Sequence, residues 1–207
     1  MQALATVDRM KSTKYRSLRQ LDGSEAIYLS GSAGLAWRVR KGVVRLDTTD
    51  RDGQRSFASL AVAGDIIGCE TLLFGCYTFS ASALTQCELS PWPEGDQASA
   101  GDSLLDALAK TQRRAADLIA LRGGQAIDRV LGLARLLADP AGKVILPSRQ
   151  DIADITDLRL ETISRIIKQL ERLHALNPIR LAGIHATRSF QLQPHACPEI
   201  GRASCRE

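Results

Sequence analysis

The pattern of apolar and polar positions is most regular in residues 149–172, where it predicts two short helices joined by a tight turn. In the second helix, apolar residues recur every three or four positions and define a buried face: Ile163, Ile166, Ile167, Leu170 and Leu173. Polar residues recur with the same spacing on the opposite face: Glu161, Ser164, Arg165 and Lys168. Arginine can bind guanine O6 and N7 bidentately, and a carboxylate can accept from cytosine N4. This face is therefore a candidate reader of DNA bases, although a solvated surface helix shows the same pattern.

The first of the two helices carries its own start signal. Ser148 is placed to cap it, and Asp151 in its first turn is stabilised by the positive end of the helix dipole. Its inward-facing residues are expected to be Ile152, Ala153 and Ile155. Asp157 stands where glycine is usual in such a turn, and aspartate tolerates a left-handed backbone better than most residues. Glu161 and Arg165 are four positions apart, so the carboxylate can orient the guanidinium.

Between residues 19 and 92 the pattern is different, because short apolar runs are separated by glycines and other turn residues. The apolar runs are residues 26–29, 35–39, 43–46 and 56–60. This rhythm predicts an all-β sandwich or barrel, with Asp52-Gly53 as a hairpin turn. The stretch 91–95, which contains two prolines and a glycine, is expected to break the β pattern, and residues 97–101 are expected to form a loop.

Helical periodicity returns at residues 103–121, where one apolar seam has a heptad-like spacing: Leu104, Leu108, Thr111, Ala115 and Leu118. Gly123-Gly124 is expected to end this helix, and residues 125–138 predict another amphipathic helix. Downstream we expect a strand at 143–146, a chain stop at Asn177-Pro178 and two strands of a wing at 179–185 and 188–192.

The composition is that of a globular protein. The 207 residues are 44% hydrophobic and 24% charged, and the net charge of +4 suits a polyanionic partner. No apolar run is long enough to cross a bilayer, and the N-terminus lacks a signal-peptide stretch. The five cysteines, an odd number, do not resemble a secreted disulfide framework. We therefore expect a cytoplasmic protein with no membrane partner, a short N-terminal arm at 1–18 and a disordered tail at 193–207.

The residues give little support for a catalytic or metal site. All three histidines lie beyond residue 170, so no histidine base accompanies Cys69 or Cys76 in sequence. Zinc needs a tighter ligand spacing than that of His195, Cys197 and Cys205, and an iron–sulfur cluster usually needs four cysteines. We expect no enzyme, no metal and no cofactor.

Ala153, Leu158 and the run Leu160-Glu-Thr-Ile-Ser-Arg165 together resemble the helix-turn-helix of the CRP/FNR family of bacterial transcription regulators. Glu161, Ser164 and Arg165 match the Glu-x-x-Ser-Arg base-reading pattern of that family in its FNR-like form. The resemblance implies an α+β fold in three parts. These are an N-terminal β-roll of the jelly-roll type at 1–100, a long dimerisation helix at 101–122 and a C-terminal winged helix-turn-helix at 123–207.

The same resemblance implies a homodimer that binds a palindromic site in double-stranded DNA and contacts RNA polymerase. The half-sites would be close to TTGAT and about one helical turn apart. Arg165 would read a guanine, Glu161 would accept from a base amino group, and Ser164 would contact a thymine. The remaining predicted DNA contacts are Lys168, Arg149, Gln150, Arg159, Arg180 and Arg188. For the wing arginines, ordinary surface charge explains the sequence equally well.

Residues 68–75 lie where the family places its phosphate-binding cassette, so the candidate effector pocket is Gly68, Cys69, Glu70, Thr71 and Ser80. In members that bind cyclic nucleotides, an arginine follows this segment and pairs with the phosphate. Residues 76–84 contain no arginine or lysine, and a buried phosphate without a cationic partner is strongly unfavourable. We therefore expect a regulator that does not respond to cAMP or cGMP, with an effector that the sequence leaves unknown.

Three alternatives stay open from the residues. Cys69, Cys76 and Cys87 could form a redox switch, although buried cysteines are common as packing residues. The chain could be a ligand-binding module whose helical pair contacts another protein rather than DNA. A thiol enzyme using Cys69 or Cys76 with Glu70 is the weakest of the three, because a nucleophilic cysteine normally needs a histidine base.

Overall fold

A computed structural model describes residues 18–93, 100–180 and 189–193, with the side chains of 100–103 left out. The chain forms two compact units, one ending at Leu118 and the other beginning at Ile119. The predictions for an N-terminal arm and for a disordered tail after Gln193 fall outside the described residues, as does the larger part of the loop expected at 97–101. Within the described ranges, no helix combines the length and apolarity that a membrane span requires.

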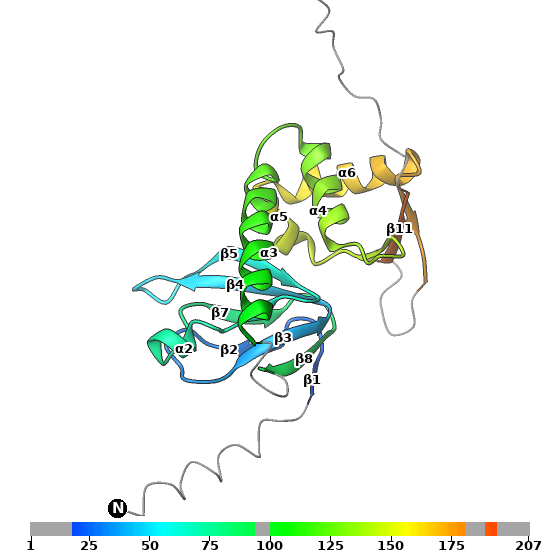
Figure 1. Ribbon diagram of the computed structural model, residues 1–207. Helices are drawn as coiled ribbons and strands as arrows, with labels where there is room; N and C mark the ends of the chain where they lie inside the picture. The colour runs from blue at the N-terminus through cyan, green and yellow to red at the C-terminus, as the bar shows by residue number, and fades with distance from the viewer. Residues whose placement is uncertain (1–17, 94–99, 181–188, 194–207) are drawn as a thin grey trace, which may run out of the picture. The chain divides into compact units, whose positions relative to one another are not determined.

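The first unit is built from two antiparallel four-stranded sheets, ordered β1-β8-β3-β6 and β2-β7-β4-β5 (Figure 1). The strands of the first sheet are β1 (Arg19–Leu21), β3 (Ala36–Lys41), β6 (Ile66–Ile67) and β8 (Cys87–Trp92). Those of the second are β2 (Ala26–Tyr28), β4 (Val43–Thr49), β5 (Arg55–Val62) and β7 (Ser80–Ala83). The short helix α2 (Thr71–Phe74) lies between β6 and β7 in sequence. The all-β prediction for this stretch is confirmed.

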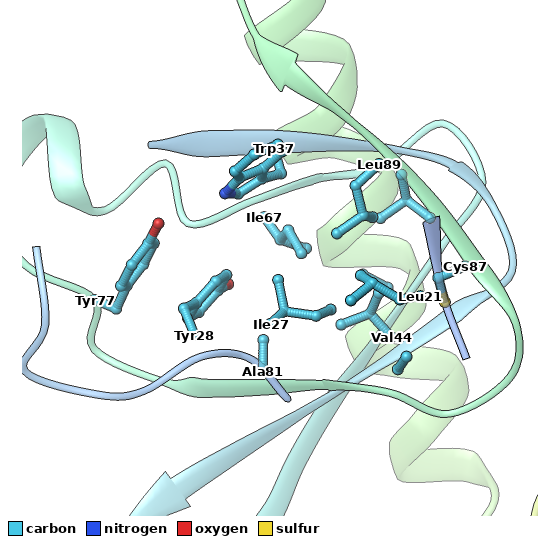
Figure 2. Packing of buried hydrophobic residues seen from close by; sticks show 13 residues of the cluster. Leu21, Ile27, Tyr28, Trp37, Val44, Ile67, Tyr77, Ala81, Cys87 and Leu89 are labelled. Atoms are coloured by element: carbon cyan, nitrogen blue, oxygen red, sulfur yellow. The ribbon is translucent and has the colours of Figure 1, made fainter. Parts of the chain in front are cut away.

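The core of this unit fills the space between the two sheets, as Figure 2 shows. Its buried residues come from both sheets and include Leu21, Trp37, Val39, Val44, Ala81 and Leu89. Alternate residues of a strand point to opposite faces, so each sheet contributes every second position to this layer. Val39, Val44 and Leu89 are fully buried. Burial of this kind contributes about 25 cal/mol for each Å² of apolar surface removed from water.

Turn chemistry explains the β4–β5 hairpin, and strand position explains how β8 accommodates a proline before it ends. The β4–β5 hairpin turns at Asp50–Gln54, where the Asp50 carboxylate accepts from the Gln54 amide at 2.8 Å and Gly53 has φ +81°. Strand β8 ends at Trp92, within the stretch 91–95 that is expected to break the β pattern, although Pro91 itself still pairs with Trp37 of β3. The other neighbour of β8 is β1, which pairs with residues 87–89 of β8 and does not reach Pro91. A proline is tolerated where a strand has a neighbour on one side, because its missing N–H breaks no ladder bond there.

Helix α3 (Ala100–Ala120) confirms the predicted long helix, but it begins earlier than expected and includes Ala100 and Gly101. The Arg114 guanidinium forms an ion pair with Asp65 at 3.1 Å. The predicted seam is wrong at Leu118, which is buried within the single chain at 7% exposure. The exposed large apolar residues of α3 are Leu104, Leu105, Leu108 and Ile119. The other four seam positions, Leu104, Leu108, Thr111 and Ala115, are exposed as expected, and at the end of the helix Ile119 is exposed in place of Leu118.

Among the described residues of the second unit that follow α3, the chain forms three helices and one small sheet. The helices are α4 (Ala126–Leu137), α5 (Arg149–Thr156) and α6 (Leu160–Arg172). The strands are β9 (Lys143–Ile145), β10 (Leu176–Pro178) and β11 (Ser189–Leu192), in the antiparallel order β10-β11-β9. The predicted helix at 125–138 and the strand at 143–146 are confirmed within a residue or two of their ends.

The stop expected at Asn177-Pro178 is wrong, because both residues belong to β10. Strand β10 lies at the edge of its sheet, where a proline costs no ladder hydrogen bond. The first wing strand was expected at 179–185, but the described strand begins earlier, at Leu176, and residues 181–188 lie outside the described ranges. The second expected strand is present as β11.

Candidate nucleic-acid interface

One face of α6 is anchored in the second unit. Ile163 and Leu170 are fully buried and Ile166 is 6% exposed, and α6 packs against α4 and α5. Ile167 is half-buried, so it lies at the border of this face. Leu173 was expected in the same face but is 45% exposed, because the helix ends at Arg172 and Leu173 occupies its C-cap position. The buried isoleucines and Leu170 thus fix which face of α6 points outward.

The opposite face of α6 is exposed and polar. Glu161, Arg165 and Lys168 are exposed, and Ser164 between them is half-buried. Glu161 lies in the first turn, where a carboxylate is stabilised by the helix dipole. Within the part of the chain that the structure describes, no ion pair joins Glu161 to Arg165. The guanidinium of Arg165 therefore extends from the helix without the partner that the spacing predicts. Exposed ion pairs contribute little to the free energy of folding, so the absence of this pair costs little stability.

Helix α5 and the connection to α6 follow the local signals of the sequence. The Ser148 hydroxyl accepts from the Asp151 amide at 3.1 Å, which confirms the predicted N-cap. Asp157 adopts the left-handed conformation with φ 54° and ψ 47°, so the chain turns at this residue without a glycine. The Thr156 side chain is fully buried, and its hydroxyl donates to the Ile152 carbonyl at 2.6 Å. The buried Thr156 and the left-handed Asp157 thus mark the point where the chain leaves α5 for the three-residue connection to α6.

The other residues predicted to contact DNA are spread over α5, the turn and the small sheet. Arg149 and Gln150 are exposed in the first turn of α5, and the Gln150 amide donates to the Asp154 carboxylate at 2.9 Å. Arg159 is exposed at the N-cap position of α6, and Arg180 is exposed just after β10. Arg188 lies outside the described residues. Arg159 therefore adjoins the exposed face of α6 in sequence, while the placement of Arg188 is not described.

Two arginines that the sequence reasoning passed over hold the end of α5. The Arg122 guanidinium donates to the carbonyls of Asp154 and Ile155, at 3.2 and 3.4 Å. The Arg129 guanidinium donates to the Thr156 carbonyl at 3.2 Å. Arg122 lies beside Gly123-Gly124 in the linker and Arg129 lies in the first turns of α4, and neither position has a pattern that marks it in sequence.

In the β-sandwich, most of the predicted effector-pocket residues lie around α2, whereas Ser80 lies in β7. Gly68 has φ +72°, and the Thr71 hydroxyl donates to its carbonyl at 2.7 Å. The half-buried Glu70 carboxylate accepts from the Thr78 amide at 3.4 Å. Ser80 is buried at the start of β7, where its hydroxyl accepts from the Ser30 amide at 3.1 Å. Gly68, Glu70 and Thr71 thus belong to the α2 segment, while Ser80 serves the strand pairing.

Tyr77 fills the space beside this segment. Its ring stacks on that of Tyr28, with centroids 3.7 Å apart and planes within 7° (Figure 2). Its hydroxyl donates to the Leu35 carbonyl at 2.7 Å. A Cβ atom added to Gly34 would lie 2.2 Å from the Tyr77 hydroxyl oxygen, and one added to Gly68 would lie 2.6 Å from its ring. The two glycines therefore leave the room that the tyrosine ring takes.

The electrostatics of this region are unfavourable for an anion. Burial and the nearby Glu70 carboxylate raise the pKa of Tyr28 above its ordinary value, so the phenol stays neutral. Sequence reasoning missed Arg19, because it lies in β1 and far from residues 76–84 in sequence. Its guanidinium lies 5.4 Å from the centroid of the Trp37 ring and donates to the Ile27 carbonyl at 3.3 Å. This cation already has an aromatic and a carbonyl partner.

The three cysteines of the first unit have no disulfide partner among the described residues. Cys87 is 2% exposed, and its thiol donates to the Val43 carbonyl at 3.1 Å. Burial raises the pKa of Cys87, and burial together with Glu70 raises that of Cys69. A reactive thiol needs a lowered pKa, so these two environments favour packing over redox chemistry. Cys76 is half-buried in the segment after α2.

Comparison with known proteins gives the class of the first unit and then the family of the chain. The family model described as "Cyclic nucleotide-binding domain" matches residues 18–100, which confirms the predicted β-roll. The nitrogen fixation regulation protein FixK of Bradyrhizobium diazoefficiens is 34% identical over 156 residues, which are 68% of this chain and 65% of that protein. The chain thus spans slightly less than two thirds of the length of this relative.

Solved structures agree with that assignment. A transcriptional regulator of the CRP family from Thermus thermophilus superposes with a TM-score of 0.65 at 25% identity, over 84% of this chain and 92% of that one. FixK2 from Bradyrhizobium japonicum superposes with a TM-score of 0.62 at 26% identity, over 86% and 92% of the two chains. The chain belongs to the CRP/FNR family of transcription regulators.

Proposed function

We propose that this chain is a sequence-specific DNA-binding regulator in which α5 and α6 form a helix-turn-helix and α6 enters the major groove. The observation that carries the proposal is the division of α6 into two faces. Ile163, Ile166 and Leu170 hold one face in the unit, while Glu161 and Arg165 extend from the other. A recognition helix requires this division, because its anchoring face and its reading face must be opposite each other.

The exposed face offers the chemistry that base reading requires. Arg165 reads a guanine through two hydrogen bonds, and Glu161 accepts from a base amino group. Ser164 is half-buried but has a short side chain that can contact a thymine close to the helix. Lys168, one turn further along, contacts phosphate and fixes the register of the helix without reading sequence. Arg149, Gln150, Arg159, Arg180 and Arg188 supply further backbone contacts in this proposal.

Binding as a homodimer is the second part of the proposal. Leu105, Leu108 and Ile119 are 67%, 56% and 74% exposed along α3, and such a stripe on a long helix favours association with a second copy. A twofold dimer presents two α6 helices to two half-sites about one helical turn apart. We propose residues 1–100 as the β-roll domain, 101–122 as the dimerisation helix and 123–207 as the DNA-binding domain. By resemblance to the family, the proposal also includes regulation through contact with RNA polymerase and no catalytic activity.

The third part is that the β-roll does not bind cAMP or cGMP. Tyr77 occupies the space beside Gly68, and the Glu70 carboxylate would repel a phosphate. Residues 76–84 provide no arginine or lysine for a buried phosphate, and Arg19 is already engaged with Trp37 and Ile27. A buried anion without a charge partner costs several kcal/mol, on the order of the whole binding free energy of a small ligand. The effector is left unassigned.

Fluorescence anisotropy with labelled duplexes tests the proposal. One duplex carries inverted TTGAT half-sites with centres about one helical turn apart, and the matched control carries the same bases in scrambled order. We expect preferential binding of the palindrome, with an affinity that falls steeply as salt rises because lysine and arginine displace counterions. Equal binding of both duplexes, or a salt-insensitive signal, would instead favour an interaction module. Calorimetric titration with cAMP should show no heat of binding.

A further inference from the structure

The linker between α3 and α4 and the C-terminus of α5 converge on the side chains of Arg122 and Arg129. The Arg129 guanidinium donates to the carbonyls of Gly123 and Gly124, at 3.2 and 3.3 Å from Nε. The same group donates to the Thr156 carbonyl from Nη1 at 3.2 Å. One side chain thus joins the glycine linker to the last residue of α5.

Arg122 completes the arrangement from within the linker itself. Its Nη2 donates to the Asp154 carbonyl at 3.2 Å and its Nε to the Ile155 carbonyl at 3.4 Å. The carbonyls of three consecutive residues at the end of α5 therefore accept from two guanidinium groups. All of these contacts lie within the second unit, so they do not depend on how the two units are placed.

The physical reason for this arrangement is the exposed end of the helix. The last carbonyls of an α-helix have no partner within the helix, and they carry the negative end of its dipole. A guanidinium has five N–H donors in a fixed plane, so it can bind two adjacent carbonyls at once. Asp157, which follows directly, turns the chain towards α6 in a left-handed conformation. Contacts to residues 154–156 therefore act on the residues that set the direction in which α6 begins.

We infer that Arg122 and Arg129 are positioning residues for sequence-specific DNA recognition. They hold the α5–α6 turn in register with the Gly123-Gly124 linker, so that α6 presents its exposed face in one fixed orientation. This inference rests on the proposed function, because the orientation matters through the reading of bases. Neither arginine needs to touch DNA for this role. A linker that changes conformation breaks the Arg129 contacts and releases the end of α5 at the same time.

Three variants of the full chain test the inference: Arg122→Ala, Arg122→Lys and Arg129→Ala. The readout is the ratio of affinities for the palindromic and the scrambled duplex at one salt concentration. We expect the ratio to fall by about tenfold in the alanine variants, the effect of losing a hydrogen bond to a charged group. Arg122→Lys keeps the charge but not the planar fork, so it should lower the ratio while leaving binding of the scrambled duplex unchanged. Arg51→Ala removes an exposed arginine of the β4–β5 turn and serves as the charge control.

Amide hydrogen exchange provides a readout that needs no DNA. In Arg122→Ala and Arg129→Ala, amides of residues 157–163 should exchange faster, while those in the middle of α4 keep their protection. Unchanged affinity ratios together with unchanged exchange would overturn the inference and leave the proposed function intact. A wild-type protein with no preference for the palindrome would overturn both. An equal loss of binding to both duplexes, with faster exchange throughout the second unit, would show a structural role only and would also overturn it.

Discussion

Replacement of Arg165 by alanine separates base reading from folding. Arg165 is exposed on α6, and its neighbours at the buried face, Ile163 and Ile166, keep their packing when the guanidinium is removed. Surface substitutions of this kind change the free energy of unfolding by about 0.5 kcal/mol or less. The folded structure therefore predicts that Arg165→Ala yields a protein with the stability and oligomeric state of the wild type.

The loss should appear in DNA recognition alone. A bidentate arginine–guanine contact contributes about 1–3 kcal/mol to discrimination, which corresponds to about 5- to 150-fold in affinity for each half-site. Glu161 forms no ion pair with Arg165 in the described structure, so Arg165→Ala removes no ion pair between these two residues. Binding to scrambled DNA should weaken only through the loss of one charge, and the salt dependence should change little.

The assay is anisotropy with four duplexes: the TTGAT palindrome, its scrambled form, and two palindromes in which the guanine is replaced by adenine or by cytosine. Wild-type protein should prefer guanine, and Arg165→Ala should bind the three palindromes about equally. Arg51→Ala, with the same loss of charge in the β4–β5 turn, should keep the guanine preference. The reasoning is refuted if Arg165→Ala retains the wild-type preference for guanine, because the exposed guanidinium would then play no part in reading that base.

Three further predictions concern stability and thiol chemistry. Ser148→Ala removes the hydroxyl that accepts from the Asp151 amide, so it should lower the free energy of unfolding of the second unit by about 1 kcal/mol in urea titrations followed by far-UV circular dichroism. Ile163→Ala should lower it by about 2–5 kcal/mol, because Ile163 is fully buried, whereas Leu173→Ala at an exposed position should change it by less than about 0.5 kcal/mol. Burial raises the pKa of Cys87 above its ordinary value of 9.0, so alkylation followed by mass spectrometry at pH 8 should label it only after unfolding. The folded thiol keeps its proton while the unfolded one ionises, so this group's contribution to stability is present below pH 9.0 and is lost as the pH rises above it. Equal labelling rates of Cys87 in folded and unfolded protein would contradict the packing assigned to it.

The parts of the fold that sequence could predict are those that have local causes. The period of α6, the cap at Ser148 and the left-handed turn at Asp157 each depend on a few neighbouring residues. The hairpin at Asp50–Gln54 is similar, because a glycine and an aspartate determine it. Such signals do not need the rest of the chain, and the predictions from them were confirmed.

The errors arose where distant residues decide the outcome. Pro91 and Pro178 each lie inside a strand and are paired there on one side only, and strand order is not visible in sequence. Leu118 has the spacing of an exposed seam but is buried in the folded chain, at 7% exposure. Tyr77 could not be placed beside Gly34 and Gly68 from its own neighbours, because that packing joins three separate segments.

The candidate site shows the same division. The exposed positions of Glu161, Arg165 and Lys168 follow from helical periodicity, because three buried residues fix the opposite face. The contacts of Arg122 and Arg129 with residues 154–156 join parts of the chain about 30 residues apart, as loop closure in a compact domain allows. No local pattern in the linker indicates these partners, so only the folded structure could identify the two arginines.

Selection from a pool of random duplexes by the purified full chain measures the central claim most directly, because it assumes no half-site. If α6 reads bases from a twofold dimer, the bound fraction will converge on an inverted repeat with a fixed guanine in each half and centres about one helical turn apart. A bound fraction that keeps the base composition of the starting pool would contradict the claim, since the exposed face of α6 would then have no sequence to recognise.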